Sequence, residues 1–224
     1  MAKGAVRIAP SVLSVDLLRL QDRVTAVIEG GADWIHVDVM DGRFVPNLTF
    51  GATMIEAIRR VTEIPIDVHL MVEQPEQFIE SFAAAGASVF TFHPEATRHV
   101  QRHLEAVRHR GMLAGLALNP GSPLAHAAEV VGDLDLLLVM TVNPGFGAQE
   151  LIPASIGKIS RARQLLMDHG SRAYLEVDGG VTLDTIAAVH AAGADTFVAG
   201  SAVFKSDDPG RQVQELRKRC YSVA

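Results

Sequence analysis

The sequence predicts an α/β fold, a (β/α)8 TIM barrel in which eight parallel strands are surrounded by helices. Strand-like and helix-like segments alternate along the whole chain, which is typical of a parallel sheet with crossover helices. Eight strands can be placed in this way, and a length of 224 residues suits one barrel. We therefore expect a single domain over residues 1–224.

The strands are expected where short runs of apolar residues lie between turn residues. Their predicted ranges are residues 8–11, 34–39, 66–70, 89–92, 112–118, 134–140, 174–177 and 196–199. The helices are expected where apolar residues recur at helical spacing. Their predicted ranges are residues 16–29, 51–61, 75–85, 97–110, 123–130, 153–168, 183–192 and 207–221.

Prolines and glycines support these helix boundaries. Pro75, Pro123 and Pro153 suit the first turn of a helix, where the missing backbone N–H has no intrahelical acceptor to lose. Glycines stand where four of the helices should end: Gly86, Gly111, Gly170 and Gly193. The turns that lead into the strands are short and alike, so we interpret them as structural.

The segments that follow the strands contain more unusual residues, at 41–47, 119–121, 143–147 and 178–180. In (β/α)8 barrels the loops at the C-terminal ends of the strands form the active site. A doubly wound sheet would instead carry a glycine fingerprint in its first βα turn. The turn at residues 11–14 contains no glycine, so we favour the barrel and expect the functional site after the strands.

Composition limits the classes of function. The net charge of −6 argues against a nucleic-acid partner, and we interpret the basic runs at 98–110 and 217–219 as solvated or subunit-facing helix surfaces. The single cysteine, Cys220, has no disulfide partner, which favours a reducing compartment. No apolar segment near the N-terminus is long enough for a signal peptide or a membrane span. We therefore expect a cytoplasmic protein with no membrane partner.

Four side chains near the ends of three strands suggest a metal site. Alternation over residues 34–39 places His36 and Asp38 on one face of the second strand. His69 has the corresponding place in the third strand, and Asp178 follows the seventh. Two imidazoles and two carboxylates suit Zn²⁺ or Fe²⁺, and also Mn²⁺ or Co²⁺. The alternative is a pair of interior histidines hydrogen-bonded to the aspartates. We favour the metal site because unpaired buried carboxylates are costly.

Glycine-rich segments after the later strands suggest a phosphate site: Gly145-Phe146-Gly147, Gly179-Gly180 and Gly200-Ser201. Barrels often bind a substrate phosphate with the loops after strands seven and eight, where glycine permits close approach of the backbone. The alternative is that each is an ordinary turn glycine. Their occurrence after consecutive strands favours phosphate.

Further residues with inward parity border the expected site. Core packing is the usual role of methionine, and we add the hypothesis that Met40, Met71 and Met140 form a water-excluding collar over the site. His93 follows the fourth strand, so we expect it to contact either a metal ligand or the substrate.

The segments that carry these residues resemble the ribulose-phosphate 3-epimerase family. Six of them occur in the order and approximate spacing of the family: residues 9–14 (APSVLS), 36–42 (HVDVMDG), 67–71 (DVHLM), 141–147 (TVNPGFG), 176–180 (EVDGG) and 199–201 (AGS). The resemblance spans nearly the whole chain. It implies a ribulose-phosphate-binding (β/α)8 barrel that interconverts D-ribulose 5-phosphate and D-xylulose 5-phosphate in carbohydrate metabolism, as in the pentose phosphate pathway.

The resemblance also implies roles for individual residues. In the family, the residues that match His36, Asp38, His69 and Asp178 bind one divalent metal ion. Those that match Asp38 and Asp178 act as the proton acceptor and donor. The residues that match the substrate contacts of the family are Ser11, His69, Gly145, Phe146, Gly147, Ala148, Asp178, Gly179, Gly180, Gly200 and Ser201. The family also implies a homo-oligomer, either a dimer or a hexamer.

One position departs from the family pattern, because Ala148 stands where the family usually has a glycine. Its backbone N–H can still bind phosphate unless the position requires a positive φ. A related enzyme that acts on D-allulose 6-phosphate shares most of these motifs. Two other interpretations keep the barrel, namely a metal-dependent hydrolase and a non-catalytic sugar-phosphate-binding protein. The paired carboxylates favour epimerisation, which requires acid/base groups on both faces of one carbon.

Overall fold

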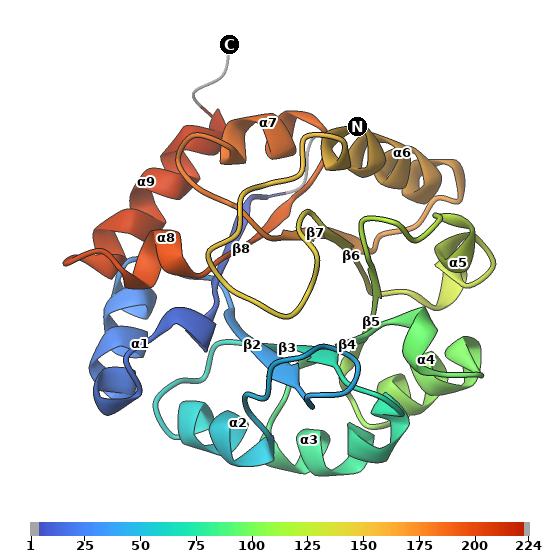
Figure 1. The fold of residues 1–224 in the computed structure, drawn as a ribbon, viewed down its shortest axis with the longest axis horizontal. Coiled ribbons are helices and arrows are strands. Elements are labelled where there is room, and N and C mark those ends of the chain that lie inside the picture. The colour runs from blue at the N-terminus through green and yellow to red at the C-terminus, as the bar shows by residue number, and fades with distance from the viewer. Residues whose placement is uncertain (1–4, 222–224) are drawn as a thin grey trace.

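The computed structural model describes residues 5–221 as a barrel of eight parallel strands (Figure 1). Residues 1–4 and 222–224 of the predicted domain lie outside the described residues. The strands are β1 (Arg7–Pro10), β2 (Ile35–Met40), β3 (Ile66–Met71), β4 (Val89–Phe92), β5 (Leu113–Leu118), β6 (Leu136–Met140), β7 (Tyr174–Asp178) and β8 (Thr196–Ala199). Their order is β1-β8-β7-β6-β5-β4-β3-β2, and a parallel bridge between Ser11 and His36 joins β1 to β2. The prediction of a (β/α)8 barrel is confirmed.

Helices surround the strands on the outside of the barrel (Figure 1). They are α1 (Leu20–Glu29), α2 (Ala52–Arg59), α3 (Ile79–Ala85), α4 (Val100–His109), α5 (Ala125–Ala128), α6 (Ser155–Asp168), α7 (Ile186–Ala191), α8 (Ser201–Phe204) and α9 (Pro209–Tyr221). Two predicted helices, 16–29 and 75–85, each begin with a separate 3₁₀ segment, Leu17–Arg19 and Pro75–Phe78 respectively.

Other helix boundaries also differ from the prediction. The predicted helix 97–110 begins only at Val100, because Thr97 is extended and its hydroxyl lies 2.8 Å from Nδ1 of His103. The predicted helix 123–130 is α-helical only over Ala125–Ala128. Helix α8 was not predicted, because a four-residue helix is too short to show helical periodicity.

Two apolar cores lie on opposite sides of the strands. Outward side chains such as Ile35, Val37 and Val39 belong to the large core shared with the helices. Inward side chains such as Trp34 and Leu138 fill the interior of the barrel. The alternation predicted over residues 34–39 is therefore confirmed. It leaves the inward positions at the C-terminal ends of β2, β3 and β7 for polar side chains.

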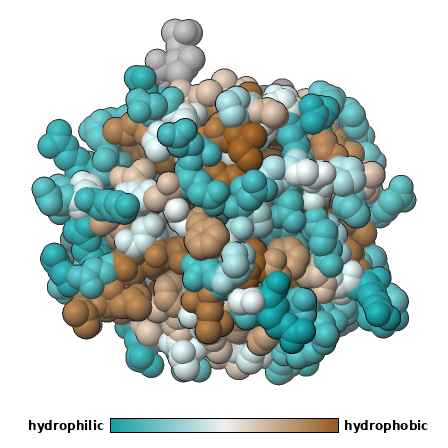
Figure 2. Space-filling view, in the orientation of Figure 1, coloured by the Kyte–Doolittle hydropathy of each residue, from teal (hydrophilic) through white to brown (hydrophobic). Residues whose placement is uncertain are grey.

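The molecular surface is mixed in character. Figure 2 shows a mainly hydrophilic outer edge with a hydrophobic area at its lower left. Among residues 5–221, no helix combines the length and the hydropathy that crossing a membrane would require. The predicted solvated surface at 217–219 needs one correction. Arg217 donates hydrogen bonds to the carbonyls of Val6 (2.6 Å) and Gly31 (2.7 Å) and to Asp33 (2.6 Å). It thus ties α9 to the segments leading into β1 and β2.

Candidate metal and active site

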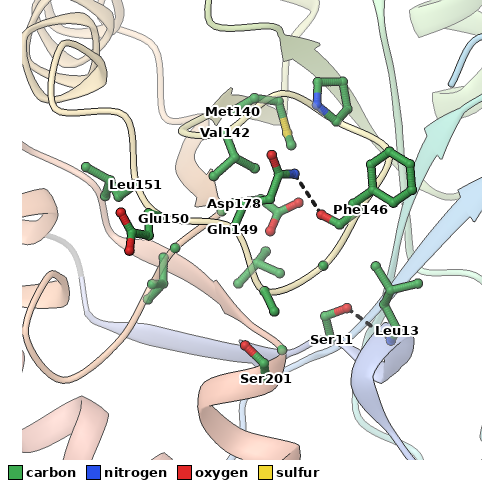
Figure 3. A pocket seen from close by; sticks show the side chains of 18 of the residues that line it. Ser11, Leu13, Met140, Val142, Phe146, Gln149, Glu150, Leu151, Asp178 and Ser201 are labelled. Carbon is green, nitrogen blue, oxygen red and sulfur yellow. Dashed lines mark hydrogen bonds between the residues drawn. The ribbon is translucent and has the colours of Figure 1, made fainter. Parts of the chain in front are cut away.

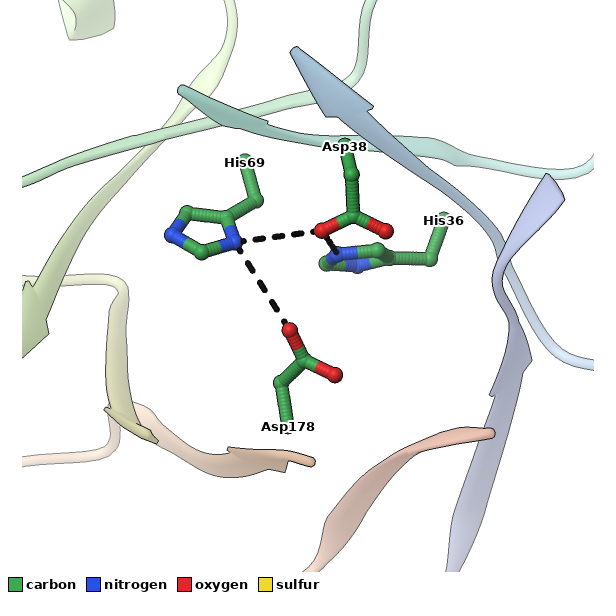
Figure 4. Close-up of side chains that lie close together, drawn as sticks. All are labelled: His36, Asp38, His69 and Asp178. Atoms are coloured by element: carbon green, nitrogen blue, oxygen red, sulfur yellow. Dashed lines mark hydrogen bonds and ion pairs between the residues drawn. The ribbon is translucent and has the colours of Figure 1, made fainter. Parts of the chain in front are cut away.

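The four predicted ligands converge at the C-terminal ends of their strands. His36 and Asp38 lie on β2, and the strand register places Asp38 beside His69 on β3. Asp178, the last residue of β7, reaches them from across the barrel (Figure 4). Nδ1 of His69 lies 3.4 Å from Oδ1 of Asp38 and 3.8 Å from Oδ2 of Asp178. Nε2 of His36 lies 3.3 Å from the same oxygen of Asp38.

This cluster offers the donor atoms that a divalent cation requires. One atom from each of the four side chains lies within 4.8 Å of the others. Two nitrogens and two carboxylate oxygens form a common donor set for first-row transition metals. His36, Asp38 and His69 are buried, and Nδ1 of His69 makes no hydrogen bond although it faces the cluster. A cation would supply the missing partner of this nitrogen, so the residues fit a metal ion.

The two carboxylates differ in proton affinity. Burial alone would raise the pKa of Asp38, but the neighbouring His36 and His69 outweigh it and hold that pKa well below its usual range. Burial and the negative charge of Asp38 raise the pKa of Asp178 to about 6. Asp38 is therefore the stronger candidate for a proton acceptor, and Asp178 keeps a proton more readily.

A cavity of about 680 Å³ adjoins the cluster, a size typical of small-molecule sites (Figure 3). Oγ of Ser11 donates a hydrogen bond of 2.6 Å to Oδ2 of Asp38 at its edge. The predicted substrate contacts that line the cavity are Ser11, Gly145, Phe146, Gly147, Ala148, Asp178, Gly179, Gly180, Gly200 and Ser201. His69, also a predicted substrate contact, is fully buried and does not line it.

Two positions in the loops after β6 and β7 have unusual backbone conformations. Gly180 has a φ of +64°, and a Cβ added there would lie 2.4 Å from the backbone nitrogen of Leu151. Ala148 has a φ of +58°, so the departure from glycine falls on a position with a positive φ. An L-residue pays about 1–2 kcal/mol for this left-handed conformation. Gln149 donates a hydrogen bond of 2.8 Å to the carbonyl of Phe146, which holds the turn together (Figure 3).

The three methionines of the proposed collar are buried and border the cavity. Met40 and Met71 pack with Val45, whereas Met140 belongs to the interior core of the barrel. These side chains therefore fill space beneath the loops while presenting apolar surface to the cavity.

Two inward carboxylates for which no role was predicted lie beneath the cluster. Asp67 and Glu176 are fully buried, and each offers an oxygen within 4.8 Å of a ring nitrogen of His36. Both residues alternate with apolar residues along β3 and β7, which indicates the inward parity, but parity alone does not say which inward side chains meet. His93 makes one of the two contacts expected of it, since its Nε2 lies 2.8 Å from Nε2 of His69.

Comparison with known proteins gives a consistent result. Residues 7–204 match the model of the ribulose-phosphate 3 epimerase family. Ribulose-phosphate 3-epimerase 1 of Cupriavidus necator is 53% identical over 211 residues, which cover 92% of this chain and 88% of the relative. The ribulose-phosphate 3-epimerase of Escherichia coli is 45% identical and covers 97% of both chains.

Among solved structures, 3-hexulose-6-phosphate synthase superposes with a TM-score of 0.71 at 20% identity, covering 96% of this chain and 99% of the other. At this identity the likeness supports the barrel fold alone. The sequence relatives confirm the expectation of an epimerase enzyme. The chain belongs to the ribulose-phosphate 3-epimerase family.

Proposed function

We propose that this protein inverts C3 of D-ribulose 5-phosphate to give D-xylulose 5-phosphate, reversibly, with Asp38 and Asp178 as the two acid/base groups. The observation that carries the proposal is the convergence of these carboxylates from β2 and β7 on one cavity, with pKa values displaced in opposite directions. The names of the sequence relatives support the choice of substrate.

The mechanism follows from the positions of the two carboxylates. A ketose bound between β2 and β7 presents opposite faces of C3 to Asp38 and Asp178. One carboxylate removes the C3 proton, which becomes acidic because the carbonyl beside it accepts the charge as an enediolate. The other carboxyl group returns a proton to the opposite face, so the configuration at C3 is inverted. For the reverse reaction the two aspartates exchange roles.

A divalent ion held by His36, Asp38, His69 and Asp178 would polarise the substrate carbonyl and offset the charge that develops on its oxygens. Zn²⁺ or Fe²⁺ suits the two imidazoles and two carboxylates, and Mn²⁺ or Co²⁺ can accept the same ligands. Ser11 contributes by donating its hydroxyl hydrogen to Asp38, which fixes one carboxylate oxygen and leaves the other facing the histidines.

The substrate phosphate is proposed to lie against the loops after β6, β7 and β8. Residues 145–148, 178–180 and 200–201 border the same cavity, and glycines dominate these segments. Gly180 packs against the backbone of Leu151, which holds the loops after β6 and β7 together, and we propose that backbone N–H groups of these loops bind the anion. The methionine collar completes the site by keeping water from the reacting carbon.

The experiment is a coupled assay of the purified protein on D-ribulose 5-phosphate, with and without a chelator, together with metal analysis. We expect turnover that is lost on chelation and restored by one of the four ions. D-allulose 6-phosphate serves as the second substrate, and a preference for it would transfer the proposal to that relative. Turnover that is insensitive to chelation would contradict the metal site, and bond cleavage without epimerisation would indicate the hydrolase.

Two further expectations from the sequence stay predictions. The homo-oligomer, a dimer or hexamer, is tested by light scattering on the purified protein, where a monomer would contradict it. The cytoplasmic location is tested by fractionation of the source cells.

A further inference from the structure

In each histidine of the proposed metal site, both ring nitrogens lie close to another polar side chain. Nε2 of His36 and Nδ1 of His69 face Asp38, at 3.3 and 3.4 Å from the same carboxylate oxygen. The opposite nitrogen of each ring contacts another buried side chain. For His36 this is Asp67, and for His69 it is His93. Neither Asp67 nor His93 lies among the four proposed ligands.

We infer that Asp67 and His93 are positioning residues, which fix the tautomer and the orientation of His36 and His69 so that Nε2 of His36 and Nδ1 of His69 present lone pairs to a cation. The inference rests on the proposed metal site and names the residues that set its geometry. Metal-binding histidines commonly donate their second N–H to such a partner, which orients the ring and makes the ligating nitrogen more basic.

The contact of Asp67 with His36 is determined by the strand register. Asp67 is the residue on β3 that pairs with His36 on β2, so both side chains point inward at one level of the barrel. Oδ2 of Asp67 lies 2.5 Å from Nδ1 of His36, and neither residue is exposed. A carboxylate accepts but does not donate, so the contact places the histidine proton on Nδ1. In the neutral imidazole the lone pair is then on Nε2, the nitrogen that faces Asp38 and the proposed cation.

The contact of His93 with His69 requires one donor and one acceptor. The two Nε2 atoms are 2.8 Å apart, so one of them carries a proton and the other a lone pair. If Nδ1 of His69 binds a cation, its proton is on Nε2, and His93 must be the acceptor. The ring of Phe44 packs against His93 with centroids 4.9 Å apart, which restricts rotation of the acceptor. The proton of His93 then lies on Nδ1, 3.9 Å from Oε2 of Glu95.

The two partners differ in charge, so they should differ in effect. Hydrogen bonds to an ionised acceptor are about twice as strong as neutral ones. Asp67 supplies a carboxylate to His36, whereas His93 supplies an imidazole to His69. Loss of Asp67 should therefore weaken metal binding more than loss of His93.

A purely structural role is the competing explanation, because buried polar side chains are normally hydrogen-bonded whether or not they support a site. The test compares Asp67→Asn, which keeps the size and removes the charge, with His93→Phe, which removes the acceptor. His93→Gln is the conservative variant, since its amide oxygen can lie near the former Nε2. Thr91→Val is the matched control, because Thr91 is a buried polar residue of β4 that pairs with His69 in register and whose hydroxyl has no hydrogen-bond partner.

Zinc affinity of each folded variant is measured by competition with a chelator. We expect Asp67→Asn to weaken zinc binding by about 10–100-fold, His93→Phe by a smaller factor, and His93→Gln to recover most of that loss. Thr91→Val should bind as the wild type does. Equal affinities for the wild type, Asp67→Asn and His93→Phe would overturn the inference alone. A wild-type protein that binds no zinc would contradict the proposed metal site as well.

A second measurement needs only the wild-type sequence. Nitrogen-15 NMR of the zinc-loaded protein with labelled histidine distinguishes protonated, bare and metal-bound ring nitrogens. We expect a proton on Nδ1 of His36 and on Nε2 of His69, with zinc on the other nitrogen of each ring. The opposite tautomer at either histidine would overturn the inference even if the variants failed to fold.

Discussion

Replacing Gly180 with alanine tests how closely the loops after β6 and β7 pack at the proposed phosphate site. A methyl group there would lie 2.4 Å from the backbone nitrogen and 2.8 Å from Cα of Leu151. Because these are backbone atoms, the loop that follows β6 has to move. Gly170 provides the control, since its φ of +61° is similar and an added Cβ would meet no atom within 4 Å.

The magnitude follows from the difference between the two variants. Both pay the cost of a left-handed L-residue, about 1–2 kcal/mol, and both remove the same flexibility from the unfolded chain. Only Gly180→Ala adds the overpacking term of about 1–3 kcal/mol. At about 2–4 °C per kcal/mol for a domain of this size, its Tm should lie about 2–12 °C below that of Gly170→Ala. A lost hydrogen bond to the charged phosphate is worth about 1.5–3 kcal/mol, so KM should rise about tenfold or more.

The assay combines thermal unfolding with steady-state kinetics on D-ribulose 5-phosphate. We expect Gly170→Ala to keep the wild-type KM despite its lower Tm, while Gly180→Ala changes both. Equal Tm and KM values for the two alanine variants would refute the packing argument. A raised KM in both would show that lost stability, rather than displacement of the loop, controls substrate binding.

Three further predictions concern other parts of the chain. Ala148→Gly should raise the free energy of unfolding by up to about 1 kcal/mol, because glycine relieves the strain of the left-handed conformation. The added flexibility of the unfolded chain offsets part of this gain. A Tm lower than that of the wild type would contradict the prediction. Burial raises the pKa of Cys220 to about 11, so a thiol reagent should modify it only after denaturation, and rapid reaction of the native protein would count against the burial. Metal affinity should fall as the pH drops through about 6, because burial and the charge of Asp38 raise the pKa of Asp178 to that value. A protonated carboxyl group must lose its proton before it can bind a cation. Chelator competition measured across pH tests this, and a metal affinity independent of pH would refute it.

The strands and the convergence of the four side chains could be predicted because their sequence pattern is local. Alternation over residues 34–39 placed His36 and Asp38 inward, and the side chains meet because every strand of the barrel ends at the same face. Helix ends were less accurate, since contacts such as that between the Thr97 hydroxyl and His103 form only in the folded chain.

Contacts between strands could not be predicted in the same way. The pairing of Asp67 with His36 depends on the register of β2 against β3, which alternation does not specify. The contact of His93 with His69 requires in addition the course of the chain after β4. Sequence identifies which side chains point inward, and only the assembled barrel shows which of them touch.

The most direct test of the account follows hydrogen at C3 of D-ribulose 5-phosphate in deuterated solvent, with the wild type, Asp38→Asn and Asp178→Asn. The wild type should introduce deuterium at C3 of both epimers without breaking a carbon–carbon or phosphate bond. Each variant should fold and lose epimerisation by a factor of at least about 10²–10⁴. Near-normal epimerisation by either variant, or inversion by the wild type with full retention of the original C3 hydrogen, would contradict the mechanism with two aspartates.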